Sequence, residues 1–262
     1  MPRKARKKSC TGIYHIMLRG INKQTIFEQE EDKSRFLETI KKYKEICRFH
    51  LYGYCLMDNH IHLLVKETEE SISQTIKRIS SSYVYWYNLK YERAGHLFQE
   101  RFKSEGIDTQ TSFLRCLRYI HQNPLKAGLA QNVFHSQWTS LNEYINGRLM
   151  VDIDIALNLF SNNRKTAIRR FSEFMNQLNN DQFLEHQERV RLTDEKVKDF
   201  LIHQGIKNIS DLQQMEREDR NAVLTRVIQQ RGVSIRQLSR ITGISKGVIE
   251  RVTKRVKIEE RQ

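Results

Sequence analysis

Two histidines that are separated by one residue, His60 and His62, lie in a run of alternating character. Residues 59–65 place aliphatic side chains at the intervening positions, which is typical of a β-strand with one apolar face. Both imidazoles then project from the opposite face, about 7 Å apart along the strand by its rise per residue. Neutral imidazole is a common ligand of transition metals. The spacing fits a metal site, and it fits equally a pair of histidines on a solvated face.

A tyrosine in a helical run is the second candidate for chemistry. The apolar residues of the run 113–123 fall on one stripe, and Tyr119 lies off that stripe. Helical spacing places Arg115, Tyr119 and Asn123 together on another ridge. A tyrosine that packs in the core is expected on the stripe, so this position indicates a functional phenol.

The other tyrosines of the first half divide into two groups. Tyr83 and Tyr87 continue the apolar row of a long predicted helix and are expected to pack in the core, as is Tyr43. Tyr85 and Tyr91 fall off that row. These two tyrosines remain rivals of Tyr119 as a nucleophile.

The elements that must position these residues follow from periodicity and turn residues. Strands are predicted within residues 12–20, 49–57, 60–66 and 97–107, and helices over 31–48, 71–91 and 111–122, the last ended by Pro124. The order β-α-β-β-α-β-α predicts an α+β domain, with an antiparallel sheet and its helices packed on one face, as in ferredoxin-like folds.

Three regions are expected along the chain: a sheet domain over 1–130, a helical linker region over 131–218, and a compact all-α unit over 219–262. Within the last region, residues 233–251 are typical of a helix, a glycine-containing turn and a second helix. Such a helix-turn-helix would place Lys246 and Arg251 near a major groove of duplex DNA. A helical hairpin that only packs fits the same pattern.

The composition is strongly basic, with a formal net charge of +14. Excess positive charge favours polyanionic partners, among which nucleic acid is common, although a basic protein without such a partner is also possible on charge alone. The four cysteines contain no CxxC pair and are expected to be reduced thiols. No apolar run is long enough to cross a bilayer, so we expect a cytoplasmic, nucleoid-associated protein without a membrane partner.

Four segments together carry a more specific resemblance. The segments are residues 14–20, 57–64, 95–103 and 117–128, and they occur in order within the first half of the chain. With them the sequence resembles the single-tyrosine HUH transposases, and most closely their REP-associated branch. Short members of that family lack the C-terminal all-α unit.

The resemblance implies a role for each candidate residue. It implies that His60 and His62 bind a divalent metal, Mn²⁺ or Mg²⁺, and that Tyr119 is the catalytic nucleophile. It also implies that Asn123 completes the metal site, where insertion-sequence relatives usually have glutamine. Attack by the tyrosine on phosphorus would give a covalent 5′-phosphotyrosine and a free 3′-OH, and the retained ester would allow the strands to be rejoined.

Basic residues in or beside the four segments are the candidate DNA contacts of the sheet domain: Arg19, Arg101, Lys103 and Arg115. The basic run over residues 3–8 could also grip phosphates, and a solvated terminus fits it equally.

The predicted function is therefore that of a metal-dependent transposase, an endonuclease that cleaves and rejoins hairpin-bearing single-stranded DNA. Duplex DNA would bind the C-terminal unit, and the protein would act as a monomer or homodimer. Two alternatives stay open: a transcription regulator with a silent nuclease fold, and a replication-initiator or relaxase-type nickase. Members of that second group commonly carry extra tyrosines or a helicase domain, and no GxxxxGK[ST] phosphate-binding loop occurs here.

Overall fold

The computed structural model describes residues 7–147, 149–184, 192–206, 208–230 and 232–259. The chain divides between residues 185 and 186 into two compact units. This boundary differs from those expected at residues 130 and 218. The helices between residues 131 and 185 join the core of the first unit. Two further helices, between residues 192 and 215, join the core of the second.

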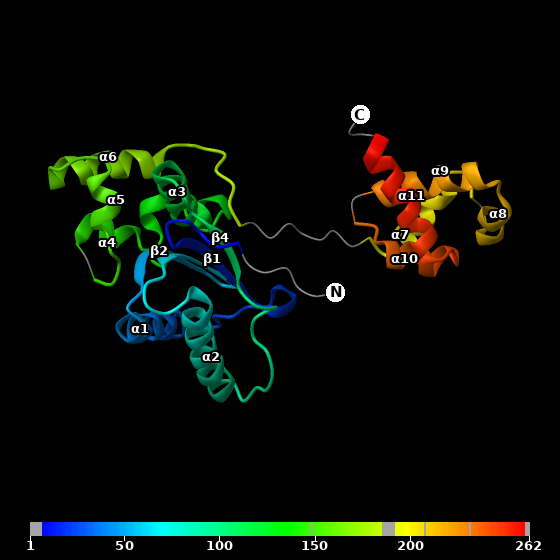
Figure 1. The fold of residues 1–262 in the computed structure, drawn as a ribbon. Helices are drawn as coiled ribbons and strands as arrows, with labels where there is room; N and C mark the ends of the chain where they lie inside the picture. The colour runs from blue at the N-terminus through cyan, green and yellow to red at the C-terminus, as the bar shows by residue number, and fades with distance from the viewer. Residues whose placement is uncertain (1–6, 148, 185–191, 207, 231, 260–262) are drawn as a thin grey trace. The chain divides into compact units, whose positions relative to one another are not determined.

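The first unit is built on a four-stranded antiparallel sheet with the strand order β2-β3-β1-β4 (Figure 1). In this sheet Met17 lies opposite His62, and Arg19 lies opposite His60. The strands are β1 (Ile13–Arg19), β2 (His50–Met57), β3 (His60–Lys66) and β4 (Lys103–Gly106). The extended run predicted over 97–107 therefore forms a strand only in its last part.

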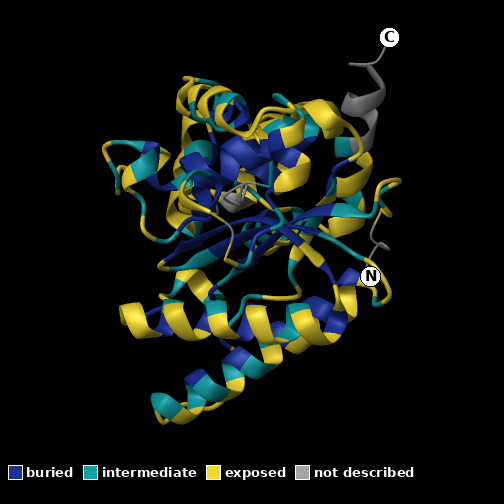
Figure 2. Cartoon of the chain, turned by 90° about the vertical axis from the view of Figure 1, so that its left-hand side faces the viewer, coloured by how far each residue is buried: buried dark blue, intermediate teal, exposed yellow. Residues whose placement is uncertain are grey.

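Helices cover both faces of the sheet. The helices α1 (Glu30–Cys47) and α2 (Ile72–Lys90) lie on one side, and α3 (Gln110–Lys126) lies on the other, so that the sheet forms the middle of three layers (Figures 1 and 2). The α+β class with an antiparallel sheet is confirmed, but the helices do not lie on one face only. The reason is that the face that carries the histidines also bears buried apolar residues, which need a cover of their own.

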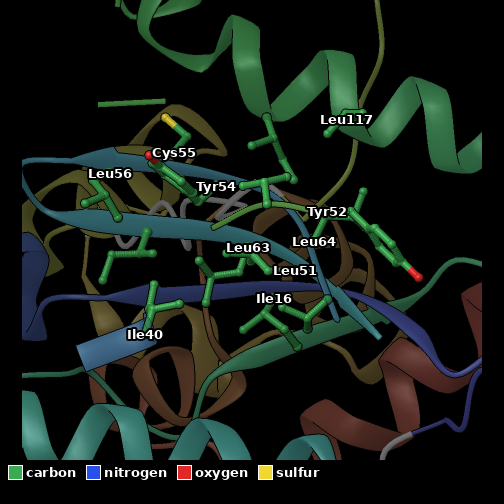
Figure 3. Packing of buried hydrophobic residues seen from close by; sticks show 14 of the residues in the cluster. Ile16, Ile40, Leu51, Tyr52, Tyr54, Cys55, Leu56, Leu63, Leu64 and Leu117 are labelled. Carbon is green, nitrogen blue, oxygen red and sulfur yellow. The ribbon is translucent and has the colours of Figure 1, made fainter. Parts of the chain in front are cut away.

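A glycine allows α3 to approach the sheet closely. A Cβ atom added to Gly53 of β2 would lie 2.6 Å from Cδ1 of Leu117 on α3, which no real contact allows. Figure 3 shows Leu117 on this side of the sheet, and Ile16, Leu63 and Ile40 of α1 on the other side. The absence of a side chain at residue 53 therefore helps to set the height of α3 above the histidines.

Helix α3 continues through Pro124 to Lys126, whereas the sequence predicted an end before the proline. Proline removes one backbone hydrogen bond from a helix because it lacks an N–H. Only two helical residues follow Pro124, so this loss affects only the last turn of α3. The helix then ends with the backbone N–H of Ala127 bonded to the carbonyl of Asn123.

The chain after α3 stays in the first unit, where it covers α3 and the edge of the sheet that β2 forms. Its helices contribute Leu141, Ala156 and Phe171 to the main core. They are α4 (Leu141–Asn146), α5 (Asp154–Asn158) and α6 (Arg164–Asn176), preceded by the short helix η2 (Val133–His135). Helix α6 contacts α3 directly, so α3 lies between the sheet and a further helix.

The second unit consists of helices around a core of its own, which includes Val197, Leu224, Leu238 and Ile249. Its elements are α7 (Asp194–His203), α8 (Ile209–Gln214), α9 (Arg217–Gln229), α10 (Ile235–Thr242) and α11 (Lys246–Glu259). Ser234 caps α10 through the N–H of Gln237, and Gly243 ends this helix in the left-handed conformation. Within the part of the chain that the structure describes, no helix is long and apolar enough to span a bilayer.

Candidate active site

The two candidate histidines lie side by side on β3, on the sheet face that α3 covers. Their ring centroids are 5.0 Å apart, which is closer than the spacing along the strand because the rings lean together. Ile61, between them, is fully buried on the opposite face, as the alternation predicts. His60 is partly exposed, but His62 is only 1% exposed, so this face is not the solvated one that a surface histidine pair requires.

Each of these histidines has a hydrogen-bond partner for its Nδ1 atom. Nδ1 of His60 lies 2.6 Å from Oδ1 of Asn59, to which it donates, and Nδ1 of His62 lies 2.9 Å from Nε2 of His15. When Nδ1 carries the proton, the lone pair of the ring is on Nε2. Both rings can therefore present Nε2 as a ligand atom.

Burial keeps the imidazoles of His15 and His62 neutral. It lowers the pKa of His15 from its ordinary value to about 3. The pKa of His62 is well below its ordinary value, first because of burial and then because of His15, His60 and Arg19 nearby. A metal binds the neutral form of histidine, so at neutral pH no proton has to be removed from a charged ring first.

Tyr119 lies against the same histidines. Its ring centroid is 5.6 Å from that of His62 and 5.7 Å from that of His15, both in edge-on contacts. The phenol side chain is buried, with 3% exposed, although Tyr119 lies off the apolar stripe of its helix. Residues 116–122 of α3 are buried on every side, because the chain beyond residue 131 covers the flank that faces away from the sheet.

A short segment that follows α6 contacts this part of α3, and we call residues 177–184 the strap. Phe183 of the strap packs on Tyr119 with ring centroids 5.6 Å apart and on His15 with centroids 6.0 Å apart. The strap is tied down by Asp181, which accepts hydrogen bonds from Nε of Arg115 at 2.7 Å and from Nε of Arg118 at 2.9 Å.

Charge reinforces the attachment of the strap. Asp181 is 4% exposed, and although burial acts to raise its pKa, the hydrogen bonds from Arg115 and Arg118 hold this pKa below its ordinary value. Lys126 donates to the backbone carbonyl of Asp181 at 3.1 Å and lies 5.1 Å from the centre of the Tyr119 ring. The same cations are placed to attract a phosphate when the carboxylate is not among them.

Asn123 lies one helical turn after Tyr119. Its side-chain N–H donates to the carbonyl of Tyr119 at 2.8 Å, which leaves the amide oxygen as the acceptor atom. The described residues contain no group of three His, Cys, Asp or Glu side chains that could hold a metal. A metal site here therefore needs an amide oxygen or a non-protein ligand beside the two histidines.

The rival tyrosines have other surroundings. Tyr85 is 74% exposed on α2, and Tyr91 donates to the buried carboxylate of Asp32 at 2.8 Å. Tyr83 and Tyr87 are buried in the core, as their spacing predicts. Among the described tyrosines, Tyr119 is the one whose ring contacts His15 and His62.

The basic residues that the sequence indicates as DNA contacts differ in exposure. Arg101 and Lys103 are exposed near the start of β4, and Arg19 is partly buried at the end of β1. The Nε atom of Arg19 is buried, with no hydrogen-bond partner among the described residues. Arg115 pairs with Asp181, as described above. In the second unit, Lys246 and Arg251 are exposed on α11.

Sequence reasoning gave no role to His15, Phe183, Asp181 or Lys126. His15 lies in a motif segment, but only the pairing of β1 with β3 brings it to His62. The strap residues are more than 55 positions away from Tyr119 in sequence, and no local pattern indicates that contact. Lys126 lies two turns after Tyr119 on α3, and helical spacing was the one signal that could have identified it.

Comparison with known families decides the relationship of the first unit. Residues 8–123 match the family model described as IS200-like transposase. Over these residues the first unit is similar to the IS200-like transposases. The matched residues include β1, β3 and α3 as far as Asn123, so all the candidate site residues of the first unit lie within the match.

Two solved structures align with the chain, and the first of them supports the fold. One is a REP-associated tyrosine transposase bound to a REP hairpin, which aligns over 73% of this chain and 100% of its own, with a TM-score of 0.53 and 15% identity. A second, from Deinococcus radiodurans r1, has only a provisional assignment as a transposase; it aligns over 46% of this chain and 97% of its own, with a TM-score of 0.34 and 13% identity. No curated protein matches the chain.

Proposed function

We propose that the first unit is a transposase domain that cleaves and rejoins single-stranded DNA, with Tyr119 as the nucleophile that becomes linked to the 5′ phosphate. The observation that supports this most is the contact of the Tyr119 ring with His62, at 5.6 Å between centroids. A phenol held beside imidazole ligands can attack a phosphate that those ligands help to bind. The similarity of residues 8–123 to the IS200-like transposases supports the same reaction class.

His60 and His62 would hold the divalent cation through their Nε2 atoms, and the amide oxygen of Asn123 would be a third ligand. The donor set fits: both Nδ1 atoms are engaged by other side chains, and nitrogen and oxygen ligands together suit Mn²⁺ and, less well, Mg²⁺. A bound cation supplies charge neutralisation on the non-bridging oxygens of the phosphate.

The remaining steps belong to the protein. Tyr119 attacks phosphorus in line, the P–O3′ bond breaks, and the departing strand leaves with its 3′-OH. The phosphate remains a diester in the phosphotyrosine, because one P–O bond has replaced another. Attack by another 3′-OH can therefore release Tyr119 and restore a DNA strand. Arg115, Arg118 and Lys126 all donate hydrogen bonds to Asp181 of the strap, and they would bind the backbone phosphates once Asp181 has moved away.

We propose a hairpin-bearing single strand as the substrate. The basic residues Arg101 and Lys103 are exposed near the β4 edge, where they can contact a phosphate backbone. The fold likeness to a transposase that binds a REP hairpin supports this substrate class. The second unit would bind duplex DNA with α11 as the recognition helix, because its exposed Lys246 and Arg251 follow a glycine-containing turn.

Strand polarity tests this function. A hairpin oligonucleotide with a single-stranded flank is labelled once at its 5′ end and once at its 3′ end, and is incubated with the full chain and Mn²⁺. The expected result is a protein adduct that carries only the 3′ label, together with a free fragment that ends in a 3′-OH. Addition of an unlabelled strand with a 3′-OH should transfer the labelled DNA to it. Cleavage without an adduct would indicate water as the nucleophile and would contradict the proposal.

A further inference from the structure

His15 lies in the middle of β1, on the sheet face that carries His60 and His62, and its side chain is fully buried. Its Nε2 atom lies 2.9 Å from Nδ1 of His62, and the two rings stack with centroids 5.1 Å apart. A polar ring at such a position costs free energy, compared with an aliphatic side chain, unless its hydrogen bonding compensates. The contact with His62 is therefore the feature that calls for an explanation.

We propose that His15 is a positioning residue that fixes the ring and the tautomer of His62, so that Nε2 of His62 faces the metal site. The inference rests on the proposed function, because it takes His62 as a metal ligand. His15 acts only through His62 and touches neither the metal nor the DNA.

The geometry favours this role over that of a third ligand. The nitrogen of His15 that can reach His62 is already directed at its Nδ1 atom. The described residues include no trio of His, Cys, Asp or Glu side chains arranged to hold a metal. Asn59 occupies the corresponding place at Nδ1 of His60. Each candidate ligand thus has one partner on the ring nitrogen away from the site, the arrangement by which neighbouring groups orient metal-binding histidines.

The protons of the pair can be placed in two ways. In one, Nδ1–H of His62 donates to Nε2 of His15, and the lone pair of His62 is on Nε2. In the other, Nε2–H of His15 donates to Nδ1 of His62, the proton of His62 is on Nε2, and binding there is blocked. Nδ1 of His15 has no hydrogen-bond partner among the described residues, and it would carry the proton in the first arrangement and the lone pair in the second, so its surroundings select neither. A metal on His62 selects the first, in which His15 is the acceptor.

An acceptor at the position of Nε2 can be kept or removed by substitution. A glutamine carbonyl reaches about as far from the backbone as Nε2 of histidine does, whereas an asparagine carbonyl reaches only to the position of Nδ1. His15→Gln should therefore keep the hydrogen bond to His62, and His15→Asn should lose it. His15→Leu removes all polar atoms at a comparable volume.

Affinity for Mn²⁺ is the measurement, by titration of the full-length protein and detection of free Mn²⁺ by electron paramagnetic resonance. We expect His15→Asn and His15→Leu to weaken Mn²⁺ binding about 10- to 100-fold, the usual effect of losing an outer partner of a ligand. His15→Gln should bind Mn²⁺ nearly as well as the wild type. If His15→Leu does not fold, the pair of amide variants still decides the question.

His121→Leu is the matched control. His121 is also fully buried in this unit, and its Nε2 atom lies 2.8 Å from Oγ of Ser140. Its loss should lower stability and leave Mn²⁺ affinity unchanged. Equal affinities of His15→Gln and His15→Asn for Mn²⁺, or wild-type affinity of folded His15→Leu, would overturn the role of His15 and leave the proposed metal site standing. A wild-type protein that binds no Mn²⁺, or a His60→Ala variant that binds it fully, would contradict the proposed metal site and the role of His15 with it.

Discussion

Phe183 packs on Tyr119 with ring centroids 5.6 Å apart, and the side chain of Tyr119 is 3% exposed. A phosphodiester cannot reach a phenol that is covered in this way. Under the proposed function, the strap that carries Phe183 must therefore leave α3 before the phenol of Tyr119 can act as the nucleophile. The rate of cleavage should depend on how strongly the strap is held.

Weakening the strap should raise the cleavage rate. Phe183→Ala removes the cover of Tyr119 without touching the histidines of β3, and we expect an increase of about tenfold, equivalent to about 1.4 kcal/mol in the opening equilibrium. Initial rates with a single-stranded hairpin substrate measure the effect. Leu178→Ala is the control, because Leu178 lies in the same strap and is 97% exposed. A rate unchanged or lowered by Phe183→Ala would show that the strap does not limit access.

Loss of a candidate metal ligand should abolish cleavage and spare hairpin binding. His60→Ala is expected to reduce cleavage to background in Mn²⁺, with a change in stability below about 1 kcal/mol because His60 is partly exposed. His62→Ala should have the same effect on cleavage but should cost about 1–3 kcal/mol of stability, since it leaves a buried void. Exposed His96 provides the control variant His96→Ala. Undiminished cleavage by the double variant of residues 60 and 62 would exclude this site.

The stability of the first unit should fall as the pH drops below 6.5, in part because of His121. Burial lowers the pKa of His121 to about 3 in the folded state, so between that value and 6.5 the unfolded chain binds one proton more than the folded chain. Folding stability then rises with pH, and His121 accounts for about 2 kcal/mol of the difference between pH 5 and pH 7.

Urea unfolding at the two pH values measures this difference. Trp86 and Trp138 are the two tryptophans of the chain, so their fluorescence reports on the first unit. His121→Gln should reduce the difference between pH 5 and pH 7 by about 2 kcal/mol. The same difference in wild type and variant would contradict a neutral, buried His121.

The sequence carried much of the fold, because alternation and helical spacing record which face of an element is buried. The strands around His60 and the helix around Tyr119 could be placed in this way. Two kinds of information were not local. The pairing register that joins His15 to His62 depends on β1 meeting β3, and the contact of Phe183 with Tyr119 depends on a strap far along the chain. The burial of Tyr119 was missed for that second reason.

The second unit should carry duplex binding, and cleavage should not need it. Helices α7 and α8 share the core of α9–α11, so a clean deletion starts at residue 186 and not at 219. The shortened protein should lose most duplex affinity yet still cut a single-stranded hairpin. In the full chain, Lys246→Ala should weaken duplex binding and reduce the slope of log affinity against log salt by about 1. Full duplex affinity in the deletion variant would show that the helix-turn-helix assignment is wrong.

The most direct test of the account is the identity of the nucleophile. In Mn²⁺ and with a cleavable single strand, the wild-type protein should form an adduct with the downstream DNA that survives denaturation. Tyr119→Phe removes one hydroxyl group at nearly constant volume, so folding and hairpin binding should persist while the adduct disappears. Tyr85→Phe and Tyr91→Phe should retain it. Peptide mapping that found the phosphate on Tyr119 would confirm the central claim; a phosphate on any other residue, or an adduct that persists in Tyr119→Phe, would contradict it.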